Sequence, residues 1–144
     1  AAAGIVATAL AGVVPGGDHP YWAMLSAAAA FAVPHAHGQL ARGLQRLAGT
    51  VVGLGVAWAL LSASLPPLAT IVVVVLLQAI VELVIGWNYG IGLVAITPLA
   101  MLLVHLAAPL PIDALLVSRL VETALGVAVA ALAIVAIRPR RRVV

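Results

Sequence analysis

Two charged residues stand one helical turn apart inside a long apolar segment near the end of the chain. Arg119 and Glu122 both lie in the run 112–137, at a spacing that puts them on one face of a helix. At about 1.5 Å per residue, Arg119 lies about 10 Å inside the start of that helix and Glu122 lies near its middle. An ionisable group at such a depth in a bilayer costs at least about 2.5–3.5 kcal/mol unless it faces a partner or a wet cavity. The pair therefore indicates either an anion site, in which Arg119 grips a carboxylate bidentately, or a structural ion pair.

A second arginine stands in the same local pattern earlier in the chain. Residues 46–53 and 119–126 share the frame R-L-x-x-T-x-x-G, and an apolar run follows each copy. The frame predicts two units of three helices, about 1–65 and about 66–137, although chance similarity between Gly- and Ala-rich helices is the alternative. Because three is odd, two such units enter the membrane from opposite sides, as in transporters with inverted repeats and a site near the midplane. Arg46 is then either a positive-inside anchor, the reading that we favour, or a second group on an anion path.

Three further positions could take part in transport. The pair Thr97-Pro98 removes a backbone hydrogen bond in mid-helix, which either lines a substrate site or produces a packing kink. His105 could titrate near neutral pH and couple protons, although a solvated histidine near the membrane interface is the simpler explanation. Glu82 is expected to pair with Arg42 or Arg46, or to carry a proton.

Glycines and aromatic residues have an ordinary structural explanation. Gly49 with Gly53, and Gly126 with Ala130, form small-xxx-small pairs that favour close helix packing. Three tryptophans, at positions 22, 58 and 87, are interpreted as interfacial or packing residues.

Enzymatic and metal chemistry find little support. The chain has no cysteine, and it lacks nucleophile-elbow, P-loop and zinc-protease motifs. His35 and His37 have no third ligand nearby, so a metal site is not expected. We predict no catalytic residues, no cofactor and no enzyme activity.

The elements that must position these residues are membrane helices. Of 144 residues, 65% are hydrophobic and 8% are charged, with a mean hydropathy of +1.27. Soluble domains are nearer half apolar and a quarter charged, so lipid must be the solvent for most of this exterior. The apolar runs are continuous and do not alternate with period two, which predicts an all-α fold, a bundle of six transmembrane helices. The predicted segments are residues 1–14, 21–33, 39–65, 68–85, 89–108 and 112–137. The first two are shorter than the roughly 20 residues that a span needs, and residues 1–14 are interpreted as the tail of a first helix.

Charge placement predicts the orientation of the bundle. The cations are seven arginines with no lysine, two of them at the start of the third segment and four in the tail 138–144. Placing both groups in the cytoplasm satisfies the positive-inside rule and puts both termini inside. This terminal clustering is unlike a phosphate-tracking surface, so nucleic-acid binding is not expected.

Four motifs carry a resemblance to a known family. They are His19-Pro20-Tyr21-Trp22-Ala23, the stretch 45–53, Asn88-Tyr89 with the Thr97-Pro98 helix, and the stretch 118–126. Together they resemble the membrane domain of the fusaric acid resistance (FUSC-like) family, which includes aromatic acid exporters and is distantly similar to aluminium-activated malate transporters. The resemblance covers nearly the whole chain. It implies a six-helix, multi-pass inner-membrane module, often dimeric, for export or passage of organic anions, aromatic acids among them. The expected partners are the bilayer, a small organic anion, and a second copy or a larger membrane assembly. The rival hypothesis is a membrane scaffold that docks a partner without transporting anything.

Overall fold

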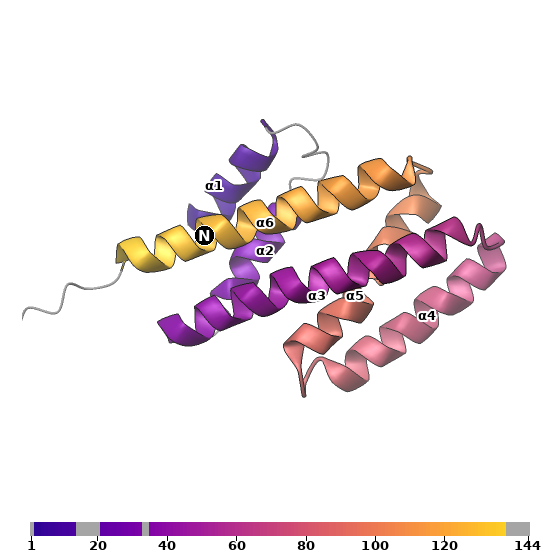
Figure 1. The fold of residues 1–144 in the computed structure, drawn as a ribbon, viewed down its shortest axis with the longest axis horizontal. Helices are drawn as coiled ribbons and strands as arrows, with labels where there is room; N and C mark the ends of the chain where they lie inside the picture. The colour runs from indigo at the N-terminus through magenta and orange to yellow at the C-terminus, as the bar shows by residue number, and fades with distance from the viewer. Residues whose placement is uncertain (1, 14–20, 33–34, 138–144) are drawn as a thin grey trace, which may run out of the picture.

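Helices account for all regular structure in the part of the chain that the structure describes. The computed structural model describes residues 2–13, 21–32 and 35–137 (Figure 1). The helices are α1 (Ala2–Ala11), α2 (Tyr21–Ala30), α3 (Ala36–Ser62), α4 (Pro67–Val84), α5 (Tyr89–Ala107) and α6 (Ile112–Ile137). The predicted all-α fold and the order of its six segments are confirmed within these residues.

The prediction that six helices cross the membrane is confirmed in part. Four helices, α3 to α6, are long and apolar enough to cross a bilayer. In contrast, α1 and α2 have 10 residues each, which is about 15 Å of helix against a hydrocarbon core of about 30 Å. The structure thus supports a membrane protein with four candidate spans and two short helices packed against them.

Two long helices form the centre of the arrangement. α3 and α6 lie side by side and run in opposite directions, so that the start of α3 and the end of α6 lie at one side of the molecule (Figure 1). α5 packs across α3, and α4 packs on α5 at the outer edge. α2 packs mainly on α6, and α1 packs on both α2 and α6. The two central helices therefore each carry one crossing helix, α5 on α3 and α2 on α6.

Proline and asparagine set the boundaries of the later helices. Pro67 occupies the first turn of α4, where its missing N–H is not needed. The Asn88 side chain caps α5 by accepting a hydrogen bond of 3.1 Å from the Ile91 N–H. α3 begins at Ala36, earlier than the predicted 39, because His35 already adopts the extended backbone of a helix cap. It ends at Ser62, before the predicted 65.

The turn after α3 contains one strained residue, which supplies a stability prediction. Ser64 has φ of 48°, in the left-handed region that residues with a Cβ adopt at a cost. We expect Ser64→Gly to raise the stability of the protein by about 0.5–1 kcal/mol, because glycine adopts this region without that cost. Thermal unfolding in detergent micelles measures the change.

The matched control for Ser64→Gly is Ser62→Gly in the last turn of α3. There the backbone is helical, so glycine should lower stability by about 0.5 kcal/mol. Equal melting temperatures for the two variants would contradict the strain at Ser64.

The apolar core has two main parts, which include α6 residues toward its two ends, and a third cluster lies between α4 and α5. The first consists of small side chains from α1, α2 and α6, which allow these helices to approach closely. Its buried members are Ala7, Ala11, Ala23, Ala27, Ala30 and Ala130. The second joins α2, α3, α5 and α6 through larger side chains, namely Trp22, Ala57, Leu61, Met101, Leu102 and Leu115. The same four helices also carry most of the buried polar residues.

Candidate functional site

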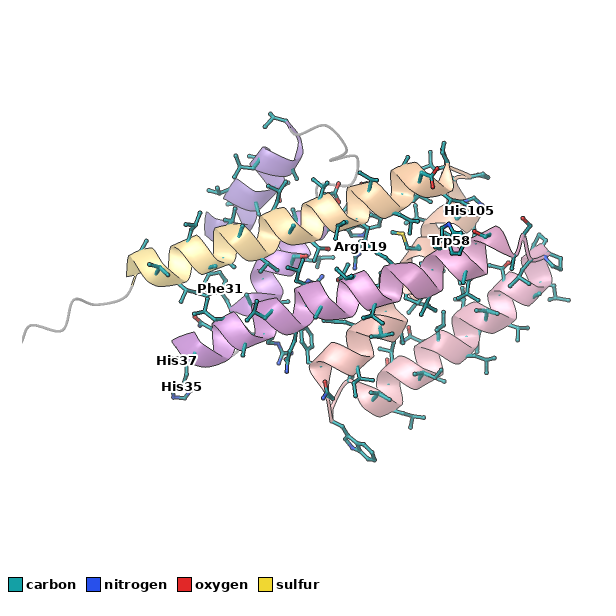
Figure 2. All side chains as sticks on the ribbon, in the orientation of Figure 1. Phe31, His35, His37, Trp58, His105 and Arg119 are labelled. Atoms are coloured by element: carbon teal, nitrogen blue, oxygen red, sulfur yellow. The ribbon has the colours of Figure 1, made fainter. Side chains whose placement is uncertain are left out.

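Polar and charged side chains are buried where α2, α3, α5 and α6 meet. They are Ser26, Arg46, Thr50, Thr97, Ser118, Arg119, Glu122 and Thr123. Figure 2 shows Arg119 near the middle of the molecule, between α3 and α6. Burying such groups in an apolar bundle is costly unless they are bonded or serve a site. We therefore take this set as the candidate site.

Arg46 is held by hydrogen bonds to two other helices. Its side chain is 8% exposed; Nε donates to Ser26 Oγ at 2.9 Å and Nη1 donates to Tyr89 Oη at 2.9 Å. The guanidinium of Arg42, one turn earlier, lies over the Tyr89 ring at 3.9 Å from its centroid. Arg46 therefore links α3 to both α2 and α5.

Arg119 is more deeply buried than Arg46, and one of its N–H donors is not hydrogen-bonded within the described residues. Its side chain is 2% exposed, and its guanidinium carbon lies 4.6 Å from the centroid of the Trp22 ring. Its Nε is buried and has no hydrogen-bond partner among the described residues. A buried N–H without an acceptor loses the hydration that it would have in water. An incoming carboxylate oxygen would restore that lost bond and add charge assistance.

Glu122 lies one turn further along α6 and is fully buried. It is 0% exposed, and its Oε1 accepts a hydrogen bond of 3.1 Å from Ser118 Oγ. The site therefore contains an acidic group as well as two basic ones.

Both arginines line a hollow of about 500 Å³ between α2 and α5. Its other lining residues are Trp22, Leu25, Ala28 and Ala29 of α2, with Ile96 and Ala100 of α5. The two guanidiniums are the charged groups on an otherwise apolar wall. Such a hollow suits a small molecule with a negative end and an apolar body.

Comparison with family models identifies the chain. The model described as fusaric acid resistance protein-like matches residues 2–133, which is most of the 144. The chain belongs to the fusaric acid resistance protein-like family. The predicted FUSC-like membership is thus confirmed, and the protein is a membrane protein of the fusaric acid resistance type. Neither the curated proteins nor the solved structures gave a significant match.

Glycines bring the crossing helices of this FUSC-like bundle into close contact. A Cβ at Gly53 of α3 would lie 2.6 Å from Thr97 Cβ of α5, and one at Gly49 would lie 2.6 Å from the Gly90 carbonyl oxygen. A Cβ at Gly126 of α6 would lie 2.6 Å from Ser26 Cβ and would also collide with the carbonyl oxygen of Ala23 in α2. These contacts fit the predicted packing role of the three glycines.

The Thr97-Pro98 pair lies within the continuous helix α5, next to residues that line the hollow. Thr97 and Pro98 are buried, and Thr97 Oγ1 donates to the Leu93 carbonyl at 2.9 Å. Pro98 lies inside the helix, where it cannot donate to the carbonyl of Val94. Both residues stand between Ile96 and Ala100, which line the hollow.

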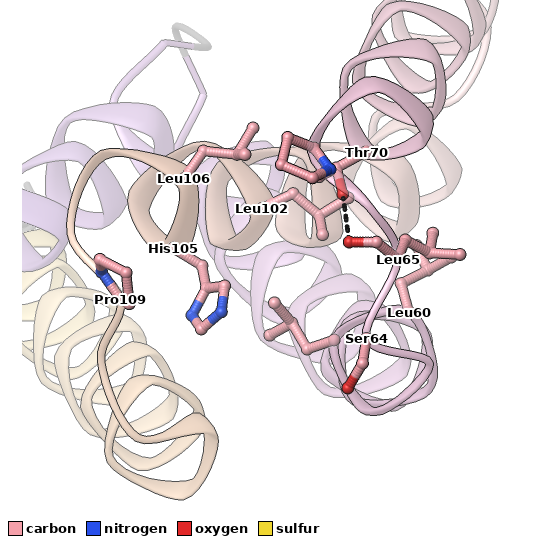
Figure 3. A pocket seen from close by; sticks show the side chains of 10 residues that line it. Leu60, Ser64, Leu65, Thr70, Leu102, His105, Leu106 and Pro109 are labelled. Atoms are coloured by element: carbon pink, nitrogen blue, oxygen red, sulfur yellow. Dashed lines mark hydrogen bonds between the residues drawn. The ribbon is translucent and has the colours of Figure 1, made fainter.

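His105 lies away from the arginines of this family member. It lines a separate hollow of about 270 Å³, together with Ser64 and Thr70 near the α3–α4 connection. Figure 3 shows the imidazole turned into that hollow, on the side of Pro109. The structure therefore places Arg46 and Arg119 on one hollow, with Glu122 one turn from Arg119 and Thr97-Pro98 next to the α5 wall, and places His105 on another hollow.

The expected pairing of Glu82 with an arginine is wrong for the described residues. Glu82 is exposed on α4, and its Oε1 accepts a hydrogen bond of 2.8 Å from Gln78 Nε2. Arg46 instead donates hydrogen bonds to Ser26 of α2 and Tyr89 of α5, and the Arg42 guanidinium lies over the Tyr89 ring. Ser26 and Tyr89 are therefore the partners of these two arginines, in place of Glu82.

The histidine pair at the start of α3 stays apart from the site. Figure 2 shows His35 and His37 at the outer end of α3, far from Arg119. Within the described ranges, no three residues of the His, Cys, Asp or Glu type are grouped as a metal ion would require.

Two contacts at the site were missed from the sequence. The Tyr89 hydroxyl and the Trp22 ring hold the two arginines, and both aromatics open helices that precede the arginine-bearing ones. That recurrence was the available signal. Ser26 carries no such signal, because a lone serine in an alanine-rich run is common.

Proposed function

We propose that this chain is a FUSC-like permease or channel module through which organic anions, aromatic acids among them, pass between α2 and α5. The observation that carries the proposal is the buried Arg119 Nε, which lacks a partner among the described residues and belongs to a side chain on the wall of an apolar hollow. Family membership supports the same conclusion. Arg119 is the group that grips the carboxylate.

The remaining site residues have distinct roles in this proposal. Arg46, fixed by Ser26 and Tyr89, supplies a second positive charge on the path. Glu122 balances charge beside Arg119, and the Thr97-Pro98 break shapes the α5 wall of the hollow. His105 belongs to the path only at the far end of α5, beyond the hollow.

The proposal includes a 3+3 inverted repeat, which matching contacts support. The third helix of each unit carries a glycine against a hydroxyl residue of the other unit's second helix: Gly53 against Thr97, and Gly126 against Ser26. Each of these hydroxyls donates to the carbonyl four residues earlier. The helix pairs correspond as well, because α3–α5 matches α6–α2 and α4–α5 matches α1–α2.

In this proposal the hollow lies between the two units. Three pairs of its lining residues are equivalent under the same correspondence: Leu25 with Ile96, Ala29 with Ala100, and Arg46 with Arg119. A site on the axis between inverted repeats is where such transporters bind substrate.

Orientation and assembly belong to the proposal too. We place the start of α3, with Arg42 and Arg46, and the end of α6 at the cytoplasmic side, which puts both termini inside. The arginine tail 138–144 lies outside the described residues. The exposed apolar faces, such as that of α4, contact lipid and a second copy or a larger membrane assembly.

A charge series at Arg119 tests the proposal. We expect Arg119→Gln to lower benzoate flux into proteoliposomes by about tenfold or more, because both the charge and the planar donor set are lost. Arg119→Lys keeps the charge and should retain clearly more flux. Radiolabelled benzoate uptake is measured beside the melting temperature of each variant.

A purely structural role for Arg119 makes a different prediction. In that case Arg119→Gln lowers the melting temperature by leaving Glu122 buried without its neighbouring positive charge, and Glu122→Gln restores stability. Full benzoate flux by a well-folded Arg119→Gln protein would rule out the anion site. Wild-type protein without any benzoate flux would favour the scaffold hypothesis.

A further inference from the structure

The two equivalent arginines are bonded unequally. Arg46 and Arg119 hold the same place in the repeated R-L-x-x-T-x-x-G frame. Arg46 Nε donates to Ser26 Oγ at 2.9 Å, whereas Arg119 Nε is buried without a partner among the described residues. The structure thus contains the acceptor for one Nε and leaves the other without one.

Thr97 occupies in α5 the position that Ser26 occupies in α2. Both hydroxyls donate to the carbonyl four residues earlier, Ser26 to Trp22 at 2.8 Å and Thr97 to Leu93 at 2.9 Å. A hydroxyl that donates its one hydrogen keeps lone pairs with which to accept. Ser26 uses this capacity on Arg46, so the Thr97 hydroxyl is chemically able to accept from Arg119 in the same way.

The hollow lies between Arg119 and the segment of α5 that carries Thr97, whose own side chain is buried beside Gly53 of α3. The residues beside Thr97 in the helix, Ile96 and Ala100, line the α5 wall, and Arg119 lines the α6 side. A movement of α5 toward α6 would therefore close the hollow and bring the two groups together. Pro98, directly after Thr97, lacks the N–H that would bond to Val94, and helices bend most readily at such a residue.

We propose that Thr97 is a positioning residue that closes the site around its anion. When a carboxylate occupies the hollow, α5 bends at Pro98 toward α6, and Thr97 Oγ1 accepts the hydrogen bond from Arg119 Nε. The other guanidinium nitrogens then hold the carboxylate in a fixed orientation. This inference rests on the proposed anion passage and adds the step that completes the site.

Substitutions that separate the hydroxyl from the methyl group of Thr97 test the proposal. Thr97→Val keeps the shape that packs against Gly53 and removes the hydroxyl, whereas Thr97→Ser keeps the hydroxyl. We expect the maximal rate of benzoate flux in proteoliposomes to fall about tenfold for Thr97→Val and to stay near wild type for Thr97→Ser. Thr8→Val is the matched control, because the Thr8 hydroxyl in α1 also donates to the carbonyl four residues earlier, at 2.9 Å to Gly4, and Thr8 does not line the hollow.

A double variant links the effect to Arg119. Arg119→Lys removes the guanidinium Nε–H, which is the proposed donor to Thr97. Adding Thr97→Val to Arg119→Lys should therefore lower the flux no further. If Thr97→Val is too unstable to measure, a comparison of Thr97→Ser with Thr97→Ala isolates the hydroxyl. The maximal rate of benzoate flux should then be about tenfold lower in Thr97→Ala.

Three results would overturn the inference. They are a Thr97→Val rate within about twofold of Thr8→Val, an equal loss in Thr97→Ser, and an undiminished effect of Thr97→Val in the Arg119→Lys protein. Loss of flux in Arg119→Gln combined with a normal rate in Thr97→Val would reject the closing step alone. Full flux in Arg119→Gln would instead reject the anion site itself.

Discussion

Gly126→Ala should destabilise the folded protein by at least about 2 kcal/mol, and Gly53→Ala by a comparable amount. The new methyl group at Gly126 would collide with the Ala23 carbonyl oxygen and would lie 2.6 Å from Ser26 Cβ. A backbone carbonyl cannot rotate away as a side chain can, so α2 would have to move off α6. A Cβ at Gly53 would lie 2.6 Å from Thr97 Cβ. That atom is bonded directly to the backbone of α5, so it cannot rotate away either.

Gly55 supplies the control on the same helix as Gly53. A Cβ at Gly55 meets nothing within 4 Å, and alanine is a better helix former than glycine by about 0.8–1 kcal/mol. Gly55→Ala should therefore be neutral or stabilising. The melting temperatures of the three purified variants in detergent, followed by tryptophan fluorescence, measure the difference. If Gly126→Ala melts together with Gly55→Ala, the close contact between α2 and α6 is absent.

The same contacts matter for the site. α2 and α5 form the two walls of the hollow, and each packs closely on its central helix at glycine positions, α5 at Gly49 and Gly53 and α2 at Gly126. A methyl group at Gly53 or Gly126 would therefore shift one wall relative to its arginine. We therefore expect Gly53→Ala and Gly126→Ala proteins that still fold to lose part of their benzoate flux.

Much of the fold could be predicted because lipid leaves few alternatives. In a bilayer every backbone polar group needs an internal partner, so long apolar runs must be helices. Prolines and polar clusters then mark the ends, and α6 has the predicted bounds 112–137. The predicted start of α3 is three residues too late, because the segment 34–38, with its proline, glycine and two histidines, is typical of a turn, whereas residues 36–38 already lie in the helix.

The number of crossings was less predictable than the number of helices. Residues 1–14 and 21–33 were short for a span, and their helices are 10 residues each. Length alone could not say whether such segments cross or pack against others. That depends on tertiary contacts, here on the small residues that bury α2 against α6.

The site could be predicted only where a residue type was anomalous for its surroundings. Arg119 and Glu122 stood out because charges are rare in apolar helices, and both are buried. The partners of Arg46 could not be predicted, because Ser26 and Tyr89 lie on other helices and the contacts depend on how these cross. The predicted pairing of Glu82 with Arg42 or Arg46 is wrong for the same reason: it was based on opposite charge, whereas pairing depends on how the helices cross.

The second large effect concerns the path itself, which introduced thiols can probe. The chain has no cysteine, so Ala29→Cys and Ala100→Cys each introduce a single thiol on opposite walls of the hollow. A thiolate attacks a sulfonate-bearing methanethiosulfonate to form a mixed disulfide, and a sulfinate leaves. The attached group carries a negative charge and fills the space between α2 and α5. Flux should therefore fall nearly to that of empty liposomes, because the anion meets both an obstacle and a like charge.

The control for this block is Ala79→Cys on the exposed face of α4. A thiol that faces lipid is neither ionised nor reached by a charged reagent, and it lies off the proposed path. Benzoate flux through Ala79→Cys protein should be the same before and after treatment. Excess benzoate should slow modification at Ala100→Cys, since both compete for the hollow.

The central claim is that the anion passes between α2 and α5, and the most direct measurement is benzoate flux through Ala100→Cys protein before and after the reagent. The account predicts normal flux before modification, near-complete block after it, and recovery when a reductant removes the group. Undiminished flux through fully modified Ala100→Cys protein would contradict it, because no anion could then be using the hollow that Arg119 lines.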